Sequence, residues 1–165
     1  MGSQALEKEA EFRQVCHWMT HKVLTISRKE NLLHAAKKMA RNNVSCLVVE
    51  ENNKPVGIIT ERDYLRKVVL EEKEPHKYLV EEVMTLTVRS LPEDADVISA
   101  FALMKKYNIR RFPVINRNGH VTGIVTQRNL LNAMDHIIRH LDWKVVQTKI
   151  AFTVFQRQLE DVEIV

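Results

Sequence analysis

Two stretches of seven residues place a threonine, an arginine and a carboxylate or amide at matching spacing. They run Gly-Ile-Ile-Thr-Glu-Arg-Asp over 57–63 and Gly-Ile-Val-Thr-Gln-Arg-Asn over 123–129. In each stretch an apolar run of strand character ends at the threonine, where a helical pattern begins. The free N–H groups at a helix N-terminus attract phosphate, and a threonine hydroxyl there can donate to a phosphate oxygen. The Asp63 carboxylate can accept from both hydroxyls of a ribose, so these residue types favour recognition of a phosphorylated sugar.

The same spacing also fits a purely structural role. Thr60-x-x-Asp63 approximates a capping box, in which the two side chains satisfy the helix N-terminus and bind no ligand. Arg62 and Arg128, each just before the last residue of its motif, either reach a phosphate or lie on the exposed helix face. A cation near a helix N-terminus opposes the helix dipole, which disfavours a merely structural arginine.

The two motifs belong to a longer internal repeat. The Met-Thr pair at 19–20 returns at 84–85, and the glycine that opens the motif at residue 57 returns at residue 123, so the offset is 65 to 66 residues. The chain is therefore expected to hold two copies of one unit. We expect them over residues 12–72 and 78–140, followed by a C-terminal extension of unclear role over residues 141–165.

Hydrophobic periodicity predicts the same elements in both copies. A short extended piece comes first, followed by an amphipathic helix, two strands joined by a turn, and a second helix. The predicted ranges are 23–26, 32–40, 46–50, 56–60 and 61–71 in the first copy, and 88–91, 97–104, 112–115, 121–126 and 127–140 in the second. The order β-α-β-β-α predicts a mixed α/β (α+β) fold.

The paired motifs, the Met-Thr entry to each copy and the Phe-Pro-Val run at 112–114 resemble CBS domains. In that family a glycine, two apolar residues and a serine or threonine are followed by an aspartate three residues later. Two CBS repeats in tandem form a CBS pair, or Bateman module, and the resemblance covers residues 12–140. It implies pseudo-two-fold symmetry, dimerisation into a disc, adenosyl ligands in the clefts between the repeats, and no catalysis.

The resemblance also implies which residues face each ligand, because each cleft combines the motif of one repeat with the strands of the other. The main site, here called the Thr60 cleft, is expected to contain Thr60, Arg62, Asp63, Thr87, Val88, Arg89, Arg110 and Arg111. The second and weaker site, the Thr126 cleft, is expected to contain Val23, Leu24, Ser45, Cys46, Thr126, Arg128 and Asn129.

A difference in charge leads us to expect unequal clefts. Arginine pairs with phosphate in a bidentate fork, so Arg110 and Arg111 favour phosphorylated ligands in the Thr60 cleft, unless they form only a solvated strand end. The corresponding residues in the Thr126 cleft, Ser45 and Cys46, are neutral, and Asn129 replaces the aspartate. An amide can still contact ribose, but without charge assistance.

The composition of the chain and its cysteine and histidine patterns indicate which classes of protein it can belong to. Hydrophobic residues make up 45% of the 165 residues and charged residues 28%, which is ordinary globular usage. No apolar run or N-terminal signal pattern predicts a membrane segment or secretion. The cysteines, Cys16 and Cys46, form no Cys-x-x-Cys motif, so we expect a reduced, cytoplasmic chain. The histidine pairs at 17/21 and 136/140 lack a third ligand, so we expect no metal site.

We therefore expect a non-catalytic regulatory module that binds AMP, ADP, ATP or another adenosyl compound and senses energy or metabolite state. The alternative is a regulatory protein that binds RNA or DNA. The net charge of +4 permits it, but an aromatic content of 6% leaves few stacking platforms.

Expected partners are a second copy of the chain and a regulated protein, but no membrane. Apolar residues on the second helices exceed what one core needs, and we expect a homodimer through Leu65, Val68, Val69, Leu130, Leu131, Met134, Ile137 and Ile138. The extension over 141–165 either packs on its own domain or across a dimer, or docks on a partner.

Overall fold

The computed structural model describes residues 12–86 and 89–140. The first copy contains β1 (Thr25–Ser27), α2 (Leu32–Arg41), β2 (Cys46–Glu51), β3 (Lys54–Thr60) and α3 (Glu61–Tyr64), which continues as a π-helical turn over Leu65–Val69. The second copy contains β4 (Leu91–Pro92), α4 (Val97–Lys106), β5 (Arg111–Ile115), β6 (Val121–Thr126) and α5 (Gln127–His140). A short 3₁₀ helix precedes each copy: η1 (Val15–His17) and η3 (Val80–Glu82).

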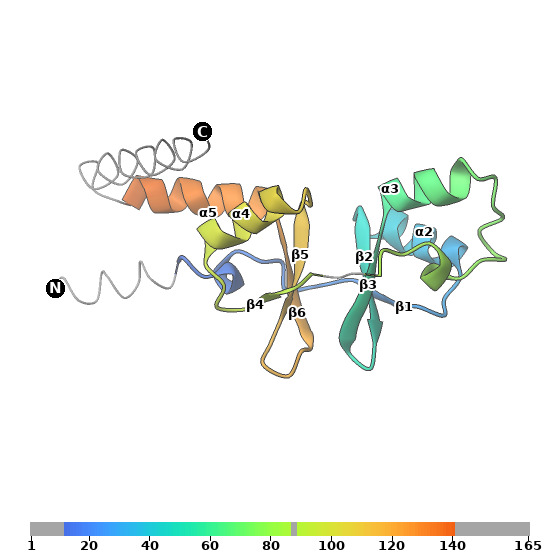
Figure 1. The fold of residues 1–165 in the computed structure, drawn as a ribbon, viewed down its shortest axis with the longest axis horizontal. Helices are drawn as coiled ribbons and strands as arrows, with labels where there is room; N and C mark the ends of the chain where they lie inside the picture. The colour runs from blue at the N-terminus through green and yellow to red at the C-terminus, as the bar shows by residue number, and fades with distance from the viewer. Residues whose placement is uncertain (1–11, 87–88, 141–165) are drawn as a thin grey trace, which may run out of the picture.

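Each copy builds one three-stranded sheet with the same connectivity. The order is β1-β2-β3 in the first sheet and β4-β5-β6 in the second. In both sheets the first strand runs parallel to the second, and the second runs antiparallel to the third. The two sheets lie beside each other at the centre of the molecule, with α2 and α3 flanking the first and α4 and α5 flanking the second (Figure 1).

The predicted β-α-β-β-α order and the mixed α/β class are confirmed. Two details differ from the prediction. The opening strands are shorter and begin later than the ranges 23–26 and 88–91. The second helix of the first copy widens after Tyr64, where the Leu70 N–H donates to the Leu65 carbonyl in an i to i−5 bond.

Local sequence signals explain where the first helix of each copy begins and ends. The Asn31 side chain accepts from the His34 N–H at the start of α2, and the Asp96 side chain accepts from two N–H groups at the start of α4. Just beyond the C-terminal ends of these helices, Asn43 and Asn108 adopt positive φ angles of 50° and 52°. Asparagine tolerates this left-handed conformation, which stops the helix and turns the chain toward the next strand.

Segments that enter one copy pack on the other copy. These entry segments are residues 12–20 and 77–85. Val15 and Met19 lie in the core of the second sheet, whereas Val80, Val83 and Met84 lie in the core of the first. Each hydrophobic core is therefore completed by residues outside its own β-α-β-β-α unit.

Backbone bridges hold both entry segments in place. Thr20 exchanges two hydrogen bonds with Ile124 of β6, at 2.9 and 3.0 Å, and Thr85 exchanges two with Ile58 of β3, at 2.9 and 3.1 Å. The Met-Thr pair that opens each copy in the sequence thus extends the sheet of the opposite copy.

This exchange explains the glycine of each motif. A Cβ atom on Gly57 would collide with the Met84 side chain, and a Cβ on Gly123 would collide with the Met19 side chain. Each methionine therefore packs directly on the strand at the glycine, where no side chain is present. The Met-Thr pair of one copy and the glycine motif of the other copy are in contact.

Candidate functional site

Two clefts between the sheets are lined by residues of both copies. The Thr60 cleft has a volume of about 590 Å³ and the Thr126 cleft about 510 Å³, within the range of small-molecule sites. Each begins at the end of the third strand of one sheet and reaches the second strand of the other. The family geometry predicted this arrangement.

The Thr60 cleft collects every residue predicted for the main site that lies in the described ranges. Those six are Thr60, Arg62, Asp63, Arg89, Arg110 and Arg111. Thr87 and Val88, also predicted there, lie outside the described residues. Residues that the sequence did not indicate complete the lining: Ser45, Ile58, Glu61, Thr85, Tyr107, Asn108, Ile109 and Pro113.

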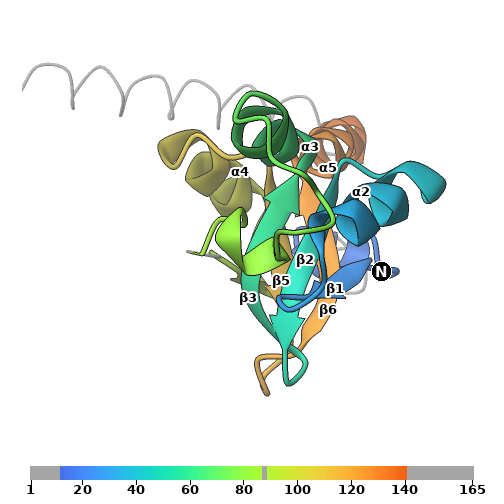
Figure 2. The same cartoon turned by 90° about the vertical axis from the view of Figure 1, so that its right-hand side faces the viewer.

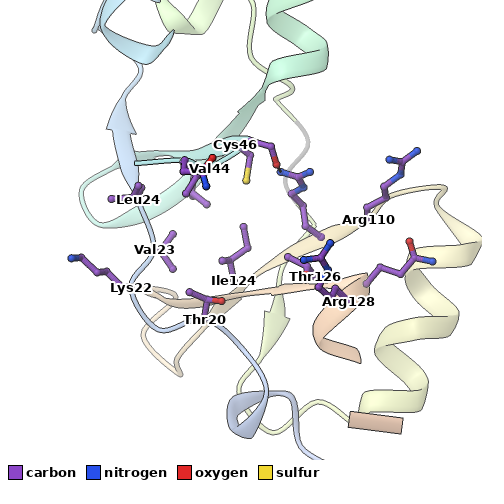
Figure 3. A pocket seen from close by; sticks show the side chains of 15 residues that line it. Thr20, Lys22, Val23, Leu24, Val44, Cys46, Arg110, Ile124, Thr126 and Arg128 are labelled. Carbon is purple, nitrogen blue, oxygen red and sulfur yellow. Dashed lines mark hydrogen bonds between the residues drawn. The ribbon is translucent and has the colours of Figure 1, made fainter. Parts of the chain in front are cut away.

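The Thr126 cleft collects six of the seven residues predicted for the second site (Figure 3). These are Val23, Leu24, Ser45, Cys46, Thr126 and Arg128. Asn129 follows in the first turn of α5 and does not itself line the cavity. The Thr126 cleft is also lined by residues that were not predicted there: Thr20, Lys22, Asn43, Val44, Val48, Arg110, Arg111, Ile124 and Gln127.

The first motif forms the capping box that the structural alternative predicted. The Thr60 N–H and hydroxyl both donate to Asp63 Oδ2, at 3.1 and 2.6 Å, and the Asp63 N–H donates to Thr60 Oγ1 at 3.2 Å. Lys67 Nζ lies 3.1 Å from the other carboxylate oxygen, Oδ1. A carboxylate offers about four acceptor positions, so the cap leaves Asp63 able to accept one further hydrogen bond.

The second motif forms the same cap with an amide. The Thr126 N–H and hydroxyl donate to Asn129 Oδ1 at 2.9 and 2.6 Å. These two bonds use both lone pairs of the amide oxygen, so Asn129 retains only N–H donors for a ligand. In both motifs the threonine hydroxyl gives its proton to the cap, and it would have to turn before it could donate to phosphate.

The arginine pair does not belong to one cleft alone. Arg110 and Arg111 line both cavities, as does Ser45, and Arg111 Nη1 donates to Ser45 Oγ at 3.2 Å. The pair lies where β5 begins, at the boundary between the two cavities. The expectation that the Thr126 cleft has only the neutral Ser45 and Cys46 in this place is therefore corrected.

An aromatic contact in the Thr60 cleft was missed at the sequence level. The guanidinium carbon of Arg89 lies 3.7 Å from the centre of the Tyr107 ring, a stacked cation–π arrangement. Tyr107 directly precedes the left-handed Asn108 at the end of α4. The positions equivalent to Arg89 and Tyr107 in the first copy are Leu24 and Asn42, so this contact has no counterpart in the Thr126 cleft.

The described part of the chain carries no sign of a metal centre or a membrane span. Over residues 12–86 and 89–140, no group of three or more His, Cys, Asp or Glu side chains is arranged to hold a metal ion. No helix within those ranges combines the length and apolar character needed to cross a membrane. Burial raises the pKa of the Cys16 thiol above its ordinary value.

The CBS domain family model matches two segments of the chain, residues 13–70 and 80–136. The chain belongs to the CBS domain family. Those segments coincide with the two β-α-β-β-α units and their entry segments, so the resemblance predicted from the paired motifs is confirmed.

The chain is similar to other proteins over about three quarters of its length. Over 121 residues the chain is 35% identical to an uncharacterized protein of Methanopyrus kandleri, and the alignment covers 73% of this chain and 62% of that protein. A solved CBS domain pair in complex with 5′-methylthioadenosine and S-adenosyl-L-methionine is 30% identical, with a TM-score of 0.65, over 73% of this chain and 98% of that one.

A hexameric CBS-CP12 protein from bloom-forming cyanobacteria is 25% identical, with a TM-score of 0.69, over 91% of this chain and 83% of that one. The CBS pair thus occurs in an adenosyl complex and in a higher oligomer among these neighbours. None of these comparisons supports the nucleic-acid alternative.

Proposed function

We propose that this CBS pair is a non-catalytic regulatory module that binds an adenosine nucleotide in the clefts between its repeats. The observation that carries the proposal is the Thr60 cleft, in which a carboxylate with a remaining acceptor position lies in one cavity with four arginines. The carboxylate suits a ribose, and the arginines suit phosphates. A solved relative that holds adenosyl compounds supports the adenosine part of this proposal.

The phosphate part of the proposal follows from charge. The Thr60 cleft is lined by Arg62, Arg89, Arg110 and Arg111, and none of these side chains takes part in an ion pair among the residues that the structure describes. Unpaired guanidinium groups favour AMP, ADP or ATP over an uncharged nucleoside. Changes in the supply of these nucleotides would then alter occupancy, which is how the module would report energy state to a regulated protein.

The decisive experiment is calorimetric titration of the full chain with adenosine, AMP and ATP. Asp63→Asn keeps the capping box, because Asn129 already forms the same box in the second motif, but it removes the acceptor offered to ribose. We expect Asp63→Asn to weaken all three ligands about tenfold or more, since a charge-assisted hydrogen bond contributes about 1.5–3 kcal/mol. Arg111→Ala is expected to weaken AMP and ATP much more than adenosine.

Glu61→Gln is the matched control, because Glu61 lines the same cavity and the substitution changes the charge by the same amount. We expect it to leave adenosine binding unchanged. If Asp63→Asn also leaves binding of all three compounds intact, the Thr60 motif is only a helix cap and the proposal is wrong. Turnover of added ATP by the purified chain would contradict the non-catalytic assignment.

We also propose that the chain self-associates through the second helices, α3 with its π-helical turn and α5. Four of the eight apolar residues predicted for this surface are more than half exposed: Leu65, Val69, Leu131 and Ile138. Val68 and Leu130 are withdrawn from the predicted surface because both are buried in their own cores. The hexameric relative supports assembly in general, while a dimer and a cytoplasmic setting stay predictions.

A further inference from the structure

The two clefts differ most in their carboxylates. Four cationic side chains line the Thr126 cleft, and no acidic residue does; the four are Lys22, Arg110, Arg111 and Arg128. The Thr60 cleft also has four cationic residues, but Glu61 and Asp63 line it with them. The formal charge of the linings is therefore +4 in the Thr126 cleft and 4 − 2 = +2 in the Thr60 cleft.

The cations of the Thr126 cleft have no anionic partner within the described ranges. None of the four is in an ion pair there, and the hydrogen bond of Arg111 goes to the neutral Ser45 hydroxyl. In the view of Figure 3, Lys22 and Arg110 stand on opposite sides of the group, with Arg128 between them. Like charges that line one cavity repel each other, and a bound anion with several charges relieves that repulsion.

The motif of this cleft carries no carboxylate. Both lone pairs of Asn129 Oδ1 are engaged by Thr126, so the side chain can only donate to a ligand. The cavity lies against the start of α5, a helix of 14 residues whose dipole favours negative charge at that end. These features suit phosphate oxygens, and the cleft has no carboxylate to accept from the hydroxyls of a ribose.

From these observations we infer that the Thr126 cleft binds a chain of two or more phosphates, while the Thr60 cleft selects for ribose. The phosphate chain belongs either to a nucleoside di- or triphosphate or to inorganic polyphosphate. The inference deepens the proposed function and rests on it only for the nucleotide source. It also reverses the phosphate preference expected from the sequence, because the arginine pair is shared and the carboxylates are not.

The repeat supplies a matched pair of variants that tests this. Arg128 lines only the Thr126 cleft, and Arg62, at the equivalent position of the first motif, lines only the Thr60 cleft. The full chain is titrated with inorganic tripolyphosphate, which has no ribose or base, and in parallel with ATP and adenosine. Arg128→Ala and Lys22→Ala are each expected to weaken tripolyphosphate about tenfold or more. The loss in Arg62→Ala is expected to be much smaller, because Glu61 and Asp63 lower the positive charge of the cleft that Arg62 lines.

The three probes separate this inference from the proposed function. If tripolyphosphate binds in an Arg128-dependent manner while adenosine and ATP do not bind, the inference holds for inorganic polyphosphate and the nucleotide function is wrong. If adenosine and ATP bind but tripolyphosphate does not, the inference is overturned and the proposed function stands. Equal losses of tripolyphosphate binding in Arg128→Ala and Arg62→Ala would also overturn it. A thermal unfolding curve for each variant confirms that the titrated chain is folded.

Discussion

A single atom separates the capping side chains of the two motifs, Asp63 and Asn129. Asp63 and Asn129 make the same three capping hydrogen bonds, and they differ only in whether the second terminal atom is an oxygen or an amide nitrogen. The cap fixes both side chains in the same way. The second terminal atom of Asp63, which lines the Thr60 cleft, is an acceptor, whereas that of Asn129, beside the Thr126 cleft, is a donor.

Asn129→Asp is expected to convert the Thr126 cleft toward the Thr60 type. The new carboxylate keeps both cap bonds and supplies an acceptor, so adenosine affinity at this cleft should rise, while tripolyphosphate affinity should fall about tenfold because a negative charge has been added. Calorimetry measures both. Gln127→Glu adds the same charge at the neighbouring lining residue, as Glu61 does in the first motif, and should lower tripolyphosphate affinity without improving adenosine binding.

The sequence could predict the cleft residues that belong to the family motif. It could not predict those that only the three-dimensional fold brings into a cleft. Thr60, Asp63 and the arginine pair follow from the motif and from the resemblance. Lys22 and Tyr107 could not be predicted, because neither belongs to the motif. Each lines a cleft only because the fold brings its segment of the chain next to that cleft. The sharing of Arg111 between clefts also needs the two sheets to be placed side by side.

Among the elements, the entry segment of residues 77–85 is held on the first sheet by an ion-pair network as well as by its core residues. Glu81 Oε2 lies 2.6 Å from Arg28 Nε, and its Oε1 lies 2.8 Å from Lys29 Nζ. The hydrogen bond from Lys29 and then that from Arg28 lower the pKa of Glu81 below its ordinary value. The segment of residues 12–20 has Cys16 at the equivalent position and lacks this network.

The stability of the chain is therefore expected to depend on Glu81 in acid. A carboxylate whose pKa is lowered in the folded state contributes stability above its unfolded-state pKa, and this contribution is lost as the pH falls through the lowered folded-state pKa. The free energy of unfolding of the wild type, measured with urea, should fall below about pH 4.5, the ordinary glutamate pKa. Glu81→Gln should remove part of this pH dependence. Asp94→Asn is the control, since no ion pair of Asp94 occurs among the described residues; an equal effect would contradict the prediction.

Element order was predictable because hydrophobic periodicity reports which face of each strand and helix is buried. Periodicity does not report which sheet a segment joins. Val15 and Met19 have the same apolar pattern whether they pack on the first copy or on the second, so the exchange of entry segments was not predicted. The π-helical turn over Leu65–Val69 leaves no pattern in these residue types either.

At the scale of the whole molecule, the second helices carry exposed apolar side chains. Figures 1 and 2 both place α3 and α5 on the upper side of the molecule. Leu65 is 56% exposed on the π-helical turn and Ile138 is 54% exposed on α5. Exposed apolar side chains on these helices favour an interface between protein copies.

Light scattering at tens of micromolar is expected to show a dimer or a larger assembly. Leu65→Glu and Ile138→Glu should shift the chain to a monomer, because a buried carboxylate without a partner opposes association. Leu86→Glu changes a leucine that is 67% exposed but lies outside the second helices, and it should leave the assembly intact. A wild-type monomer at that concentration would show that this surface does not join copies of the chain.

The exchanged entry segments also set the order in which the chain can fold as it leaves the ribosome. The first core is still incomplete when its own β-α-β-β-α unit has been synthesised, because Val80, Val83 and Met84 also belong to it. The second core contains both Met19 and Leu130, which are separated by more than a hundred residues, so Met19 stays outside a complete core until α5 has been made. Neither half can therefore complete its core alone.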